Sequence, residues 1–286
     1  MTILDSATLQ SFLALFVAVA LIPPAIYLIH RDYCDFLSLG AGGTPQTPVG
    51  YLKVKFLGLF ALPDPCVPHF LPHEHCGNGY LTSLPQRTGR RPQAKGIAPH
   101  RQMTQRSPKH VHEVFAEALR DLARDPRNLL VEGTSCFEKH GTGLFSLRPR
   151  TRTCRGEVCH VHGSDGSLHM TLYPADAKLV IERGWGERHP LARGGWLARF
   201  VPKHFVMVYA PRNEEEVGVV TRIASAAVWW VSGITVHKNG TRDDRSRSDI
   251  DNKAIDVARE TSGEGHGSAE LVHDGLEKKA MVGDGG

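Results

Sequence analysis

The chain has 286 residues, a hydrophobic content of 41% and a net charge of +4, which suffices for a hydrophobic core in one large domain or two small ones. Residues 234–286 contain no Phe, Trp, Tyr or Cys and carry 8 Lys and Arg against 11 Asp and Glu. Such a segment buries too little apolar surface to offset its ordering entropy, so a disordered polar tail is predicted there. The six cysteines form no CxxC pair and no regular framework, which favours reduced thiols.

An uncharged apolar segment of eighteen residues, Phe12 to Ile29, lies near the start of the chain. As a helix it would be about 27 Å long, close to the hydrocarbon thickness of a bilayer, so residues 1–32 are predicted to be a single-pass membrane anchor. A signal peptide and a buried core helix are the alternatives, but only Asp5 and no Lys or Arg precedes the segment. Because the basic residues follow the span, the positive-inside rule places the rest of the chain in the cytosol. A glycan on the sequon at Asn239 would reverse this topology.

Residues 33–106 are predicted to be a juxtamembrane and linker segment rich in Pro, Gly and basic residues. Lys53 and Lys55 lie in a short apolar stretch that would either rest at a membrane surface or dock as a helix on the domain. The stretch 86–102 has five Lys and Arg and no acidic residue, and it is interpreted either as a solvated loop or as an arm that contacts an anionic lipid or substrate. It lacks interleaved aromatic residues, so no nucleic-acid partner is expected.

Residues 107–233 are predicted to form an α+β domain with a largely antiparallel sheet and flanking helices. The expected elements are a helix with Ser107 as N-cap that ends at Pro126, strands at 129–136 and 144–147, a hairpin at 156–172, a helix from Pro174 to Arg183, a strand at 205–210 and a helix with Asn213 and Glu216 as its capping box.

Three histidines lie in the predicted hairpin, around the pair Asp165-Gly166. If that pair is a two-residue turn, His162 pairs with His169, and side-chain alternation places His160, His162, His169 and Thr171 on one face. Cys159, Val161, Met170 and Leu172 then form the opposite, core face. The three imidazoles are therefore expected to share the surface that faces away from the main core.

Three interpretations of this surface remain open. The imidazoles could bind zinc with a third ligand, although no accompanying Cys/His or Glu-x-x-His motif is present. They could be a solvated or structurally hydrogen-bonded face. They could also form an acid–base pocket without a cofactor, because histidine titrates near physiological pH.

A second stretch, GWGERHPLA at 184–192, places Arg188 and His189 side by side after Trp185. The two glycines indicate an irregular backbone that either presents the indole ring or belongs to a structural loop in which Trp185 packs. The sequence has no Gly-rich phosphate loop, no GxSxG elbow and no dinucleotide fingerprint.

Several motifs together resemble the fungal luciferase family. They are RDYCDFLSLG with GY at 50–51, GRRP at 89–92, CHVHGSDGSLHMTL at 159–172, GWGERHPLA at 184–192 and YAPRNEEE at 209–216. The resemblance extends over about residues 30–232 and includes the preceding membrane segment. It implies a membrane-associated oxygenase that adds O2 to 3-hydroxyhispidin, a phenolic α-pyrone, with no flavin, haem or metal. The intermediate would then lose CO2 and leave an excited caffeoyl product.

On the matching positions, the resemblance leads us to expect His160, His162 or His169 as the base and Arg188 or His189 as the partner of the developing negative charge. Trp185 is expected to be a stacking wall, with Thr171 and Glu187 as further substrate-binding residues. No metal ligand is expected. A non-catalytic, membrane-tethered binding module is the alternative function. The stretch 193–204 departs from the Gly- and Pro-rich sequence of luminous members, so the substrate would differ if this stretch lines the pocket.

Overall fold

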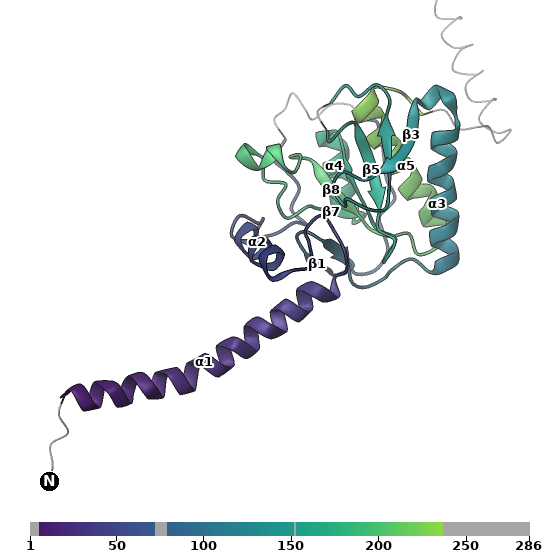
Figure 1. The fold of residues 1–286 in the computed structure, drawn as a ribbon. Coiled ribbons are helices and arrows are strands. Elements are labelled where there is room, and N and C mark those ends of the chain that lie inside the picture. The colour runs from purple at the N-terminus through teal and green to yellow at the C-terminus, as the bar shows by residue number, and fades with distance from the viewer. Residues whose placement is uncertain (1–5, 72–78, 152, 237–286) are drawn as a thin grey trace, which may run out of the picture. The chain divides into compact units, whose positions relative to one another are not determined.

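The computed structural model describes residues 6–71, 79–151 and 153–236. It confirms the α+β class with an antiparallel sheet and flanking helices (Figure 1). The helices are α1 (Ser6–Ser38), α2 (Pro48–Gly58), α3 (Lys109–Arg124), α4 (Pro174–Glu182) and α5 (Glu214–Ser232). The strands are β1 (Ala94–Gly96), β2 (His100–Gln102), β3 (Leu130–Thr134), β4 (Thr142–Ser146), β5 (Glu157–Val161), β6 (Leu168–Thr171), β7 (Gly186–Arg188) and β8 (Phe205–Val208).

The main sheet has six strands in the order β3-β4-β5-β6-β8-β7, and each neighbouring pair is antiparallel. Strands β1 and β2 form a separate two-stranded ribbon. Since β7 pairs with β8 at the sheet edge, the GWGERHPLA stretch supplies an edge strand rather than a free loop.

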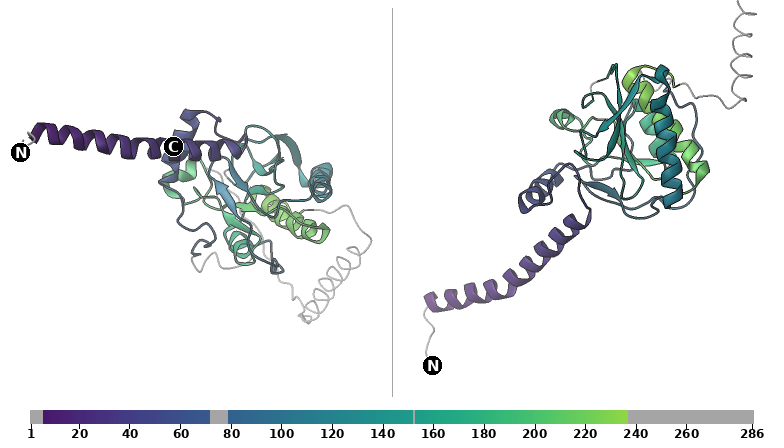
Figure 2. Two further views of the ribbon diagram at one scale, coloured as in Figure 1. Left: turned by 90° about the horizontal axis from the view of Figure 1, so that it is seen from below. Right: turned by 45° about the vertical axis from the view of Figure 1, so that its right-hand side comes forward.

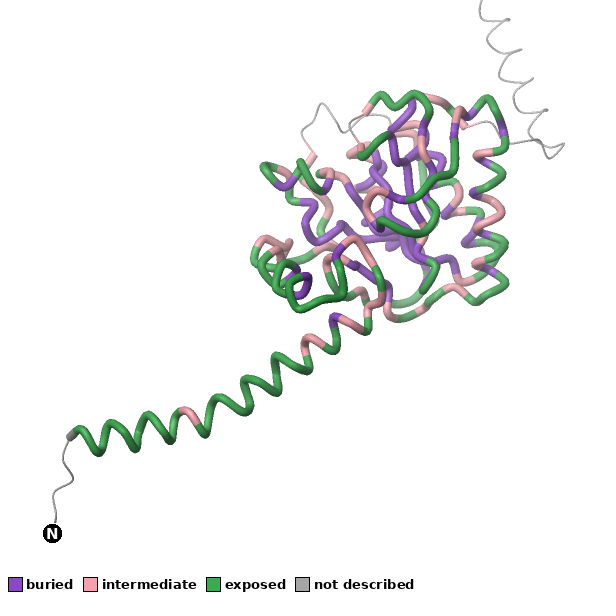
Figure 3. Tube along the Cα trace, in the orientation of Figure 1, coloured by how far each residue is buried: buried purple, intermediate pink, exposed green. Residues whose placement is uncertain are grey.

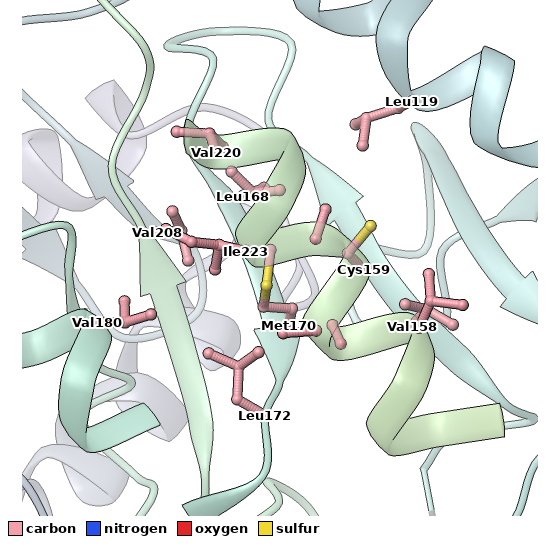
Figure 4. Close-up of a cluster of buried hydrophobic side chains, with 14 of the residues drawn as sticks. Leu119, Val158, Cys159, Leu168, Met170, Leu172, Val180, Val208, Val220 and Ile223 are labelled. Atoms are coloured by element: carbon pink, nitrogen blue, oxygen red, sulfur yellow. The ribbon is translucent and has the colours of Figure 1, made fainter. Parts of the chain in front are cut away.

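The main core lies between the sheet and helices α3 and α5, which cover one of its faces (Figure 2, right). Figure 4 shows how apolar side chains of the sheet, including Cys159, Leu168, Met170 and Val208, meet Val220 and Ile223 of α5. Helix α5 is long because its apolar residues recur at helical spacing and its small alanines allow close packing on the strands. Burial of this face leaves the opposite face of the sheet for other groups.

The start of α5 follows the prediction in part. The side chain of Asn213 accepts a hydrogen bond from the backbone N–H of Glu216, as an N-cap residue should. The Glu216 carboxylate, however, accepts from the backbone N–H of Arg212 and pairs with the Arg212 side chain, so the expected capping box is displaced by one residue. The predicted N-cap of α3 is wrong, because the Ser107 hydroxyl donates to the carbonyl of Pro211 and Pro108 occupies the cap position.

The structure corrects the domain boundary predicted at residue 107. Leu81 and Leu84 are buried in the main core, and the backbone N–H groups of Tyr80 and Leu81 donate to the buried carboxylate of Asp176 in α4. A solvated loop was one of the two interpretations of the stretch 86–102, but the stretch packs against the domain at Arg87, His100, Arg101 and Gln102, which are buried. The chain from residue 79 onward is therefore part of the folded domain and not a linker.

Leu84 tests this boundary. The Leu84 side chain is 3% exposed within the core, so Leu84→Ala should lower the free energy of unfolding by about 2–4 kcal/mol through lost burial and a cavity. Leu147→Ala is the matched control, because Leu147 is 60% exposed and its truncation should change stability by less than about 0.5 kcal/mol. Urea unfolding of the detergent-solubilised chain measures both, and equal midpoints for the two variants would show that residue 84 lies outside the cooperative core.

Helix α1 is long and apolar enough to cross a membrane, and its apolar window is not buried by other parts of the chain. The end of α1 contacts α2, where the Tyr51 hydroxyl donates to Asp32 and Phe36 packs with Tyr51 and Val54. Lys53 and Lys55 were expected either at a membrane surface or in a helix docked on the domain, and the structure places both in helix α2. The predicted tail, apart from residues 234–236, and the Asn239 sequon lie outside the described residues.

Candidate functional site

The histidine hairpin forms, but its register differs from the prediction. His160 lies opposite His169 and Val161 opposite Leu168, so the strands are shifted by two residues from the expected pairing of His162 with His169. A four-residue turn, 163–166, replaces the two-residue turn, and His162 closes it through hydrogen bonds with the backbone of Ser167 and Gly166. A shift of two residues leaves every side chain on its expected face. The prediction that the three imidazoles share the surface opposite the main core is therefore confirmed.

This surface is buried, which removes the interpretation of a solvated histidine face. His160, His162 and His169 are 2%, 1% and 3% exposed. Figure 3 shows the buried residues as a continuous purple region through the centre of the sheet. The covering groups come from residues 97–102, 136–139 and 189–205, which the sequence places far from the hairpin.

Two further histidines join the three of the hairpin. The ring of His100 lies 5.4 Å from that of His169, and the ring of His189 lies 5.4 Å from His169 and 5.3 Å from His100. Phe205 stacks on His169 at 5.1 Å, and Phe137 stacks on His160 at 6.0 Å. We call the five histidines, His100, His160, His162, His169 and His189, the imidazole cluster.

Close contacts between ring nitrogens, centred on His169, connect the imidazole cluster. Nδ1 of His169 lies 3.0 Å from Nε2 of His162 and 3.3 Å from Nε2 of His160, and its Nε2 lies 3.2 Å from Nδ1 of His100. The chain continues from His100 Nε2 to the carboxylate of Glu187 at 3.1 Å, which also accepts from the Tyr209 hydroxyl. Proton positions at these buried nitrogens are thus coupled through a continuous network.

Local backbone irregularity explains why a carboxylate reaches His160. The register between β4 and β5 shifts, so that Leu144 pairs with Cys159 but Phe145 pairs with Glu157. This bulge leaves Val158 unpaired and lets both Val158 and Cys159 enter the main core, while the Glu157 carboxylate contacts Nδ1 of His160 at 2.7 Å. A bulge in this position is one way in which a sheet aims a side chain at a functional site.

The cation beside the imidazole cluster is Arg101, not Arg188. The Arg101 guanidinium makes two hydrogen bonds of 2.8 and 2.9 Å to the carboxylate of Glu138, whose Oε1 lies 3.6 Å from Nε2 of His162. Arg188 lies opposite Val206 of the core face, and its guanidinium donates to the carbonyl of Ala192. Its expected role as an oxyanion partner therefore has no geometric support.

The other predicted binding residues are also placed differently. Trp185 packs in the main core, and its indole N–H donates to the carbonyl of Pro85, so it forms no wall of the imidazole cluster. Thr171 is buried opposite Phe205 on β8. Glu187 contacts His100 and Tyr209 and acts within the network rather than as a free substrate ligand.

His189 has a structural role in the fold. Its Nε2 donates to the carbonyl of Ile97, and its Nδ1 accepts from the backbone N–H of Leu191, so both ring nitrogens are used and the imidazole is neutral. Burial, with the neighbouring imidazoles adding to it, holds the pKa of His189 well below the ordinary value. This histidine joins residue 97 to residue 191 and positions the cover over the cluster.

Burial also lowers the pKa of His169 well below its ordinary value and lowers the pKa of His162 to about 4. These groups bind protons more weakly in the folded chain than in the unfolded chain, where histidine has a pKa of about 6.5. Stability is thus fully present above about pH 6.5 and is lost as the pH falls toward 4. For Glu138, burial alone would raise the pKa, but the hydrogen bond and charge of Arg101 hold it below the ordinary value.

From these shifts we predict an acid-sensitive fold. In chelator-containing buffer, His162 alone should reduce the free energy of unfolding by about 2 kcal/mol between pH 6.5 and pH 5. Urea unfolding at several pH values measures this loss of stability. The variant His162→Gln should show a smaller change of stability with pH, while His110→Ala, which replaces an exposed histidine, should show the wild-type change. A stability that stays constant from pH 7 to pH 5 would contradict the assignment of neutral buried imidazoles.

The imidazole cluster forms part of the wall of a cavity of about 670 Å³. Its remaining wall includes Phe137 and Phe205 next to the histidines, and Phe56 and Leu57 of α2. The stretch 193–204 lines the cavity with Trp196, Leu197, Ala198, Arg199, Phe200, Val201 and Pro202. The stretch that departs from the luminous members therefore borders the same cavity as the imidazole cluster. The wall combines aromatic and apolar side chains with the imidazoles and with a few charged groups, Lys53, Glu138, Lys139 and Arg199, which is typical of small-molecule sites.

Comparison with known proteins identifies the family. The family model of the luciferase domain matches residues 155–227. The luciferase of Neonothopanus nambi is 31% identical over 226 residues, which cover 73% of this chain and 83% of the relative. The luciferases of Armillaria mellea and Armillaria ostoyae are 33% and 32% identical over 222 residues, which cover 71% of this chain and 82% of each relative. The chain belongs to the fungal luciferase family. No solved structure matches it.

The matched luciferase domain contains the histidine hairpin, β7, β8 and most of α5, but it begins after several residues that complete the site. His100, Arg101, Phe137 and Glu138 all precede residue 155 and were not predicted as site residues. In this luciferase-family protein, the imidazole cluster is thus assembled from the family domain and from the segments before it. The sequence around His100 is basic and rich in proline, so it gives no indication that this histidine is buried.

Proposed function

We propose that this protein is a luciferase-like oxygenase that adds O2 to a phenolic α-pyrone of the 3-hydroxyhispidin type. Membership of the fungal luciferase family supports the class of activity. The observation that carries the proposal is the imidazole cluster in the wall of a cavity of about 670 Å³, a size suited to a substrate with two aromatic rings.

The chemistry follows from the groups that face the cavity. An imidazole of the cluster removes the proton of the ring hydroxyl, and the electron-rich carbon of the resulting enolate forms a new bond to O2. His169 is the central candidate, because its hydrogen-bonded neighbours His100 and Glu187 can share the proton it takes up. The aromatic walls exclude water from the enolate and its oxygenated product. An organic cofactor is not required, since the substrate itself is the reductant of O2.

The position of the divergent stretch 193–204 in the cavity wall supports a substrate that differs from that of luminous relatives. Trp196 packs edge-on against both Phe60 and Phe200, so the divergent stretch contributes an aromatic group at the cavity border. Trp196 and Phe200 remain more than half exposed, which leaves them available to contact a bound molecule. We propose a related pyrone with a different substituent at the end that meets this group.

We also propose that α1 anchors the protein as a single-pass membrane protein with the domain in the cytosol. Helix length and hydropathy support the span, and the excess of basic residues after it supports the orientation. Expression in eukaryotic cells followed by endoglycosidase treatment tests this topology. An endoglycosidase-sensitive mass shift that disappears in Asn239→Gln would place the domain in the lumen and overturn the orientation.

An oxygen electrode tests the catalytic proposal. Purified full-length protein in detergent is expected to consume O2 in proportion to added 3-hydroxyhispidin or a related pyrone, with light recorded in parallel as a separate readout. O2 uptake without light supports an oxygenase that is not luminous. Absence of pyrone-dependent O2 uptake across the series, in folded protein, would overturn the proposal.

A non-catalytic binding module is the second candidate, and one observation favours it. Each described imidazole of the cluster already has hydrogen-bond partners within the protein, as a purely structural cluster would. This candidate predicts saturable binding of a pyrone in calorimetry, with O2 and pyrone concentrations constant over time. Consumption of the pyrone at a catalytic rate would exclude it.

A further inference from the structure

Three imidazole nitrogens of the cluster point at one another. Nε2 of His160 and Nε2 of His162 lie 3.3 and 3.0 Å from Nδ1 of His169. Each of these residues offers one nitrogen, and the three nitrogens lie within 4.8 Å of one another. Whether these contacts are hydrogen bonds depends on where the protons are, and the partners of the other ring nitrogens determine that.

The outer nitrogens of His160 and His162 carry the protons. A carboxylate only accepts, so the contact of 2.7 Å between Glu157 and Nδ1 of His160 requires N–H at Nδ1. The Ser167 hydroxyl donates its only proton to the Asp165 carboxylate, so it must accept at 2.9 Å from Nδ1 of His162. In the neutral rings, Nε2 of both histidines is therefore an unprotonated lone pair.

The same reasoning fixes His169 through its neighbour. The Glu187 carboxylate accepts from Nε2 of His100, which leaves Nδ1 of His100 as an acceptor. At 3.2 Å that acceptor requires N–H at Nε2 of His169, so Nδ1 of His169 is also a lone pair. Three lone pairs thus converge with no proton between them, an arrangement that repels itself unless a cation lies at the centre.

We propose that His160, His162 and His169 bind a divalent first-row transition-metal ion. Two nitrogen ligands at about 2.0–2.1 Å from one ion lie about 2.8–3.0 Å apart in octahedral and about 3.3–3.4 Å apart in tetrahedral geometry, and the two separations of 3.0 and 3.3 Å agree with this range. Neutral imidazole is a preferred ligand of such ions. The Glu138 carboxylate, 3.6 Å from Nε2 of His162, is placed as a fourth donor.

Charge at the site favours a divalent cation. Four buried carboxylates contact the imidazole cluster: those of Glu138, Glu157, Asp165 and Glu187. Among the described residues, the buried cation that contacts these carboxylates is Arg101, which pairs with Glu138. Four formal negative charges against one positive charge are costly in a buried site. An ion with two positive charges offsets most of this excess.

The surroundings of the three ligands are those of a metal centre. Each ligand histidine directs its outer nitrogen to an acceptor, Glu157, Ser167 or His100, which fixes the tautomer and orients the ring. The other group of three histidines, which includes His100 and His189, is less suitable because both ring nitrogens of His189 are bonded to the backbone. His160, His169 and Glu138 border the cavity, so the ion would present open coordination positions to a bound molecule.

This inference departs from the metal-free expectation based on the resemblance. It rests on the geometry of the imidazoles and not on the proposed reaction, so either can fail alone. A bound ion would occupy Nδ1 of His169, the unprotonated nitrogen of that ring, so in the metal-bound protein His169 would be a ligand and not the base. When bound, the ion would supply a Lewis acid for a deprotonated ring hydroxyl of the pyrone.

Cobalt binding tests the site directly. Full-length protein purified in detergent without a polyhistidine tag, stripped with a chelator and dialysed, is titrated with Co²⁺ while its visible absorption is followed. One Co²⁺ per chain is expected, with d–d bands of nitrogen and oxygen ligation that Zn²⁺ displaces. Elemental analysis of the unstripped protein is expected to show a transition metal in the same ratio.

Two variants with opposite expectations complete the test. Glu157→Gln keeps the volume of a group that contacts the outer nitrogen of His160 and also accepts from Ser135 and the backbone of Cys136, and it should weaken Co²⁺ binding about 10–100-fold. His110→Ala removes an exposed histidine of α3 and should leave the affinity unchanged. No stoichiometric Co²⁺ binding by folded wild-type protein, or equal affinity in wild-type and His160→Gln/His169→Gln protein, would overturn the proposal. Pyrone-dependent O2 uptake in stripped protein is scored separately, because it concerns the reaction and not the site.

Discussion

His169→Ala is expected to lower the initial rate of pyrone-dependent O2 uptake at least 100-fold. His169 is the central residue of the cluster, in contact with His100, His160 and His162, and Phe205 stacks on its ring. Loss of a positioned base typically reduces a rate by about 10²–10⁴-fold, and this replacement also removes the group that joins the other imidazoles. The measurement is oxygen-electrode kinetics at saturating pyrone.

Two controls separate this effect from a folding defect. His169→Gln retains most of the side-chain volume and should be as inactive as the alanine variant while unfolding at a higher temperature. His110→Ala should keep the wild-type rate, since that side chain is exposed on α3. A rate within a few-fold of wild type in folded His169→Ala protein would contradict the role of the cluster in the reaction.

Arg101→Met is expected to destabilise the fold by about 3–5 kcal/mol. Arg101 forms a bidentate ion pair with Glu138 inside the protein and also donates to the carbonyl of Ala41. Removing one partner of a buried ion pair leaves an uncompensated charge, which costs far more than an exposed pair contributes. The free energy of unfolding, measured by urea denaturation at pH 7.5, gives the effect.

The double variant Arg101→Met/Glu138→Gln provides the internal control. Because it removes both charges, its loss of stability should be clearly smaller than the sum of the two single losses. The exposed pair of Arg124 and Asp121 in α3 gives the comparison, and Arg124→Met should cost less than about 1 kcal/mol. Additive single losses, or a small effect of Arg101→Met, would show that this ion pair does not hold residue 101 to residue 138.

The face of the histidine hairpin could be predicted from the sequence because strand side chains alternate with a period of two. His160 and His169 needed only this period and the position of the turn. The register could not be predicted from the Asp165-Gly166 signal, since a four-residue turn also uses this pair, with Gly166 at a positive φ of 79°. The error of two residues was harmless because it preserved the faces.

The cover of the imidazole cluster could not be predicted, because it is made by contacts between distant parts of the chain. His100 and His169 are 69 residues apart, and nothing local to the sequence around His100 indicates burial. Its surroundings are basic and rich in proline, which is the composition of a loop. Burial was possible there because the Glu138 carboxylate neutralises Arg101 and the Glu187 carboxylate binds His100.

Adjacency in sequence misled the assignment of Arg188 and Trp185. Because Trp185 and Arg188 belong to the same short motif as Glu187 and His189, all four side chains were expected at one site. Arg188 lies in strand β7, where alternation turns its side chain to the face opposite that of Glu187. Trp185 directly precedes this edge strand, and its large hydrophobic side chain is buried in the main core.

The position of a bound pyrone tests the central claim most directly. Crystals of the full-length protein purified in detergent are soaked with the pyrone under anaerobic conditions. The bound substrate is then observed before it can react with oxygen. We expect the pyrone ring in the cavity of about 670 Å³, with a ring hydroxyl at hydrogen-bond distance from His160 or His169 or from an ion bound to them. A pyrone in a different cavity, of about 320 Å³ beside His112 and Arg120 of α3, would contradict this claim.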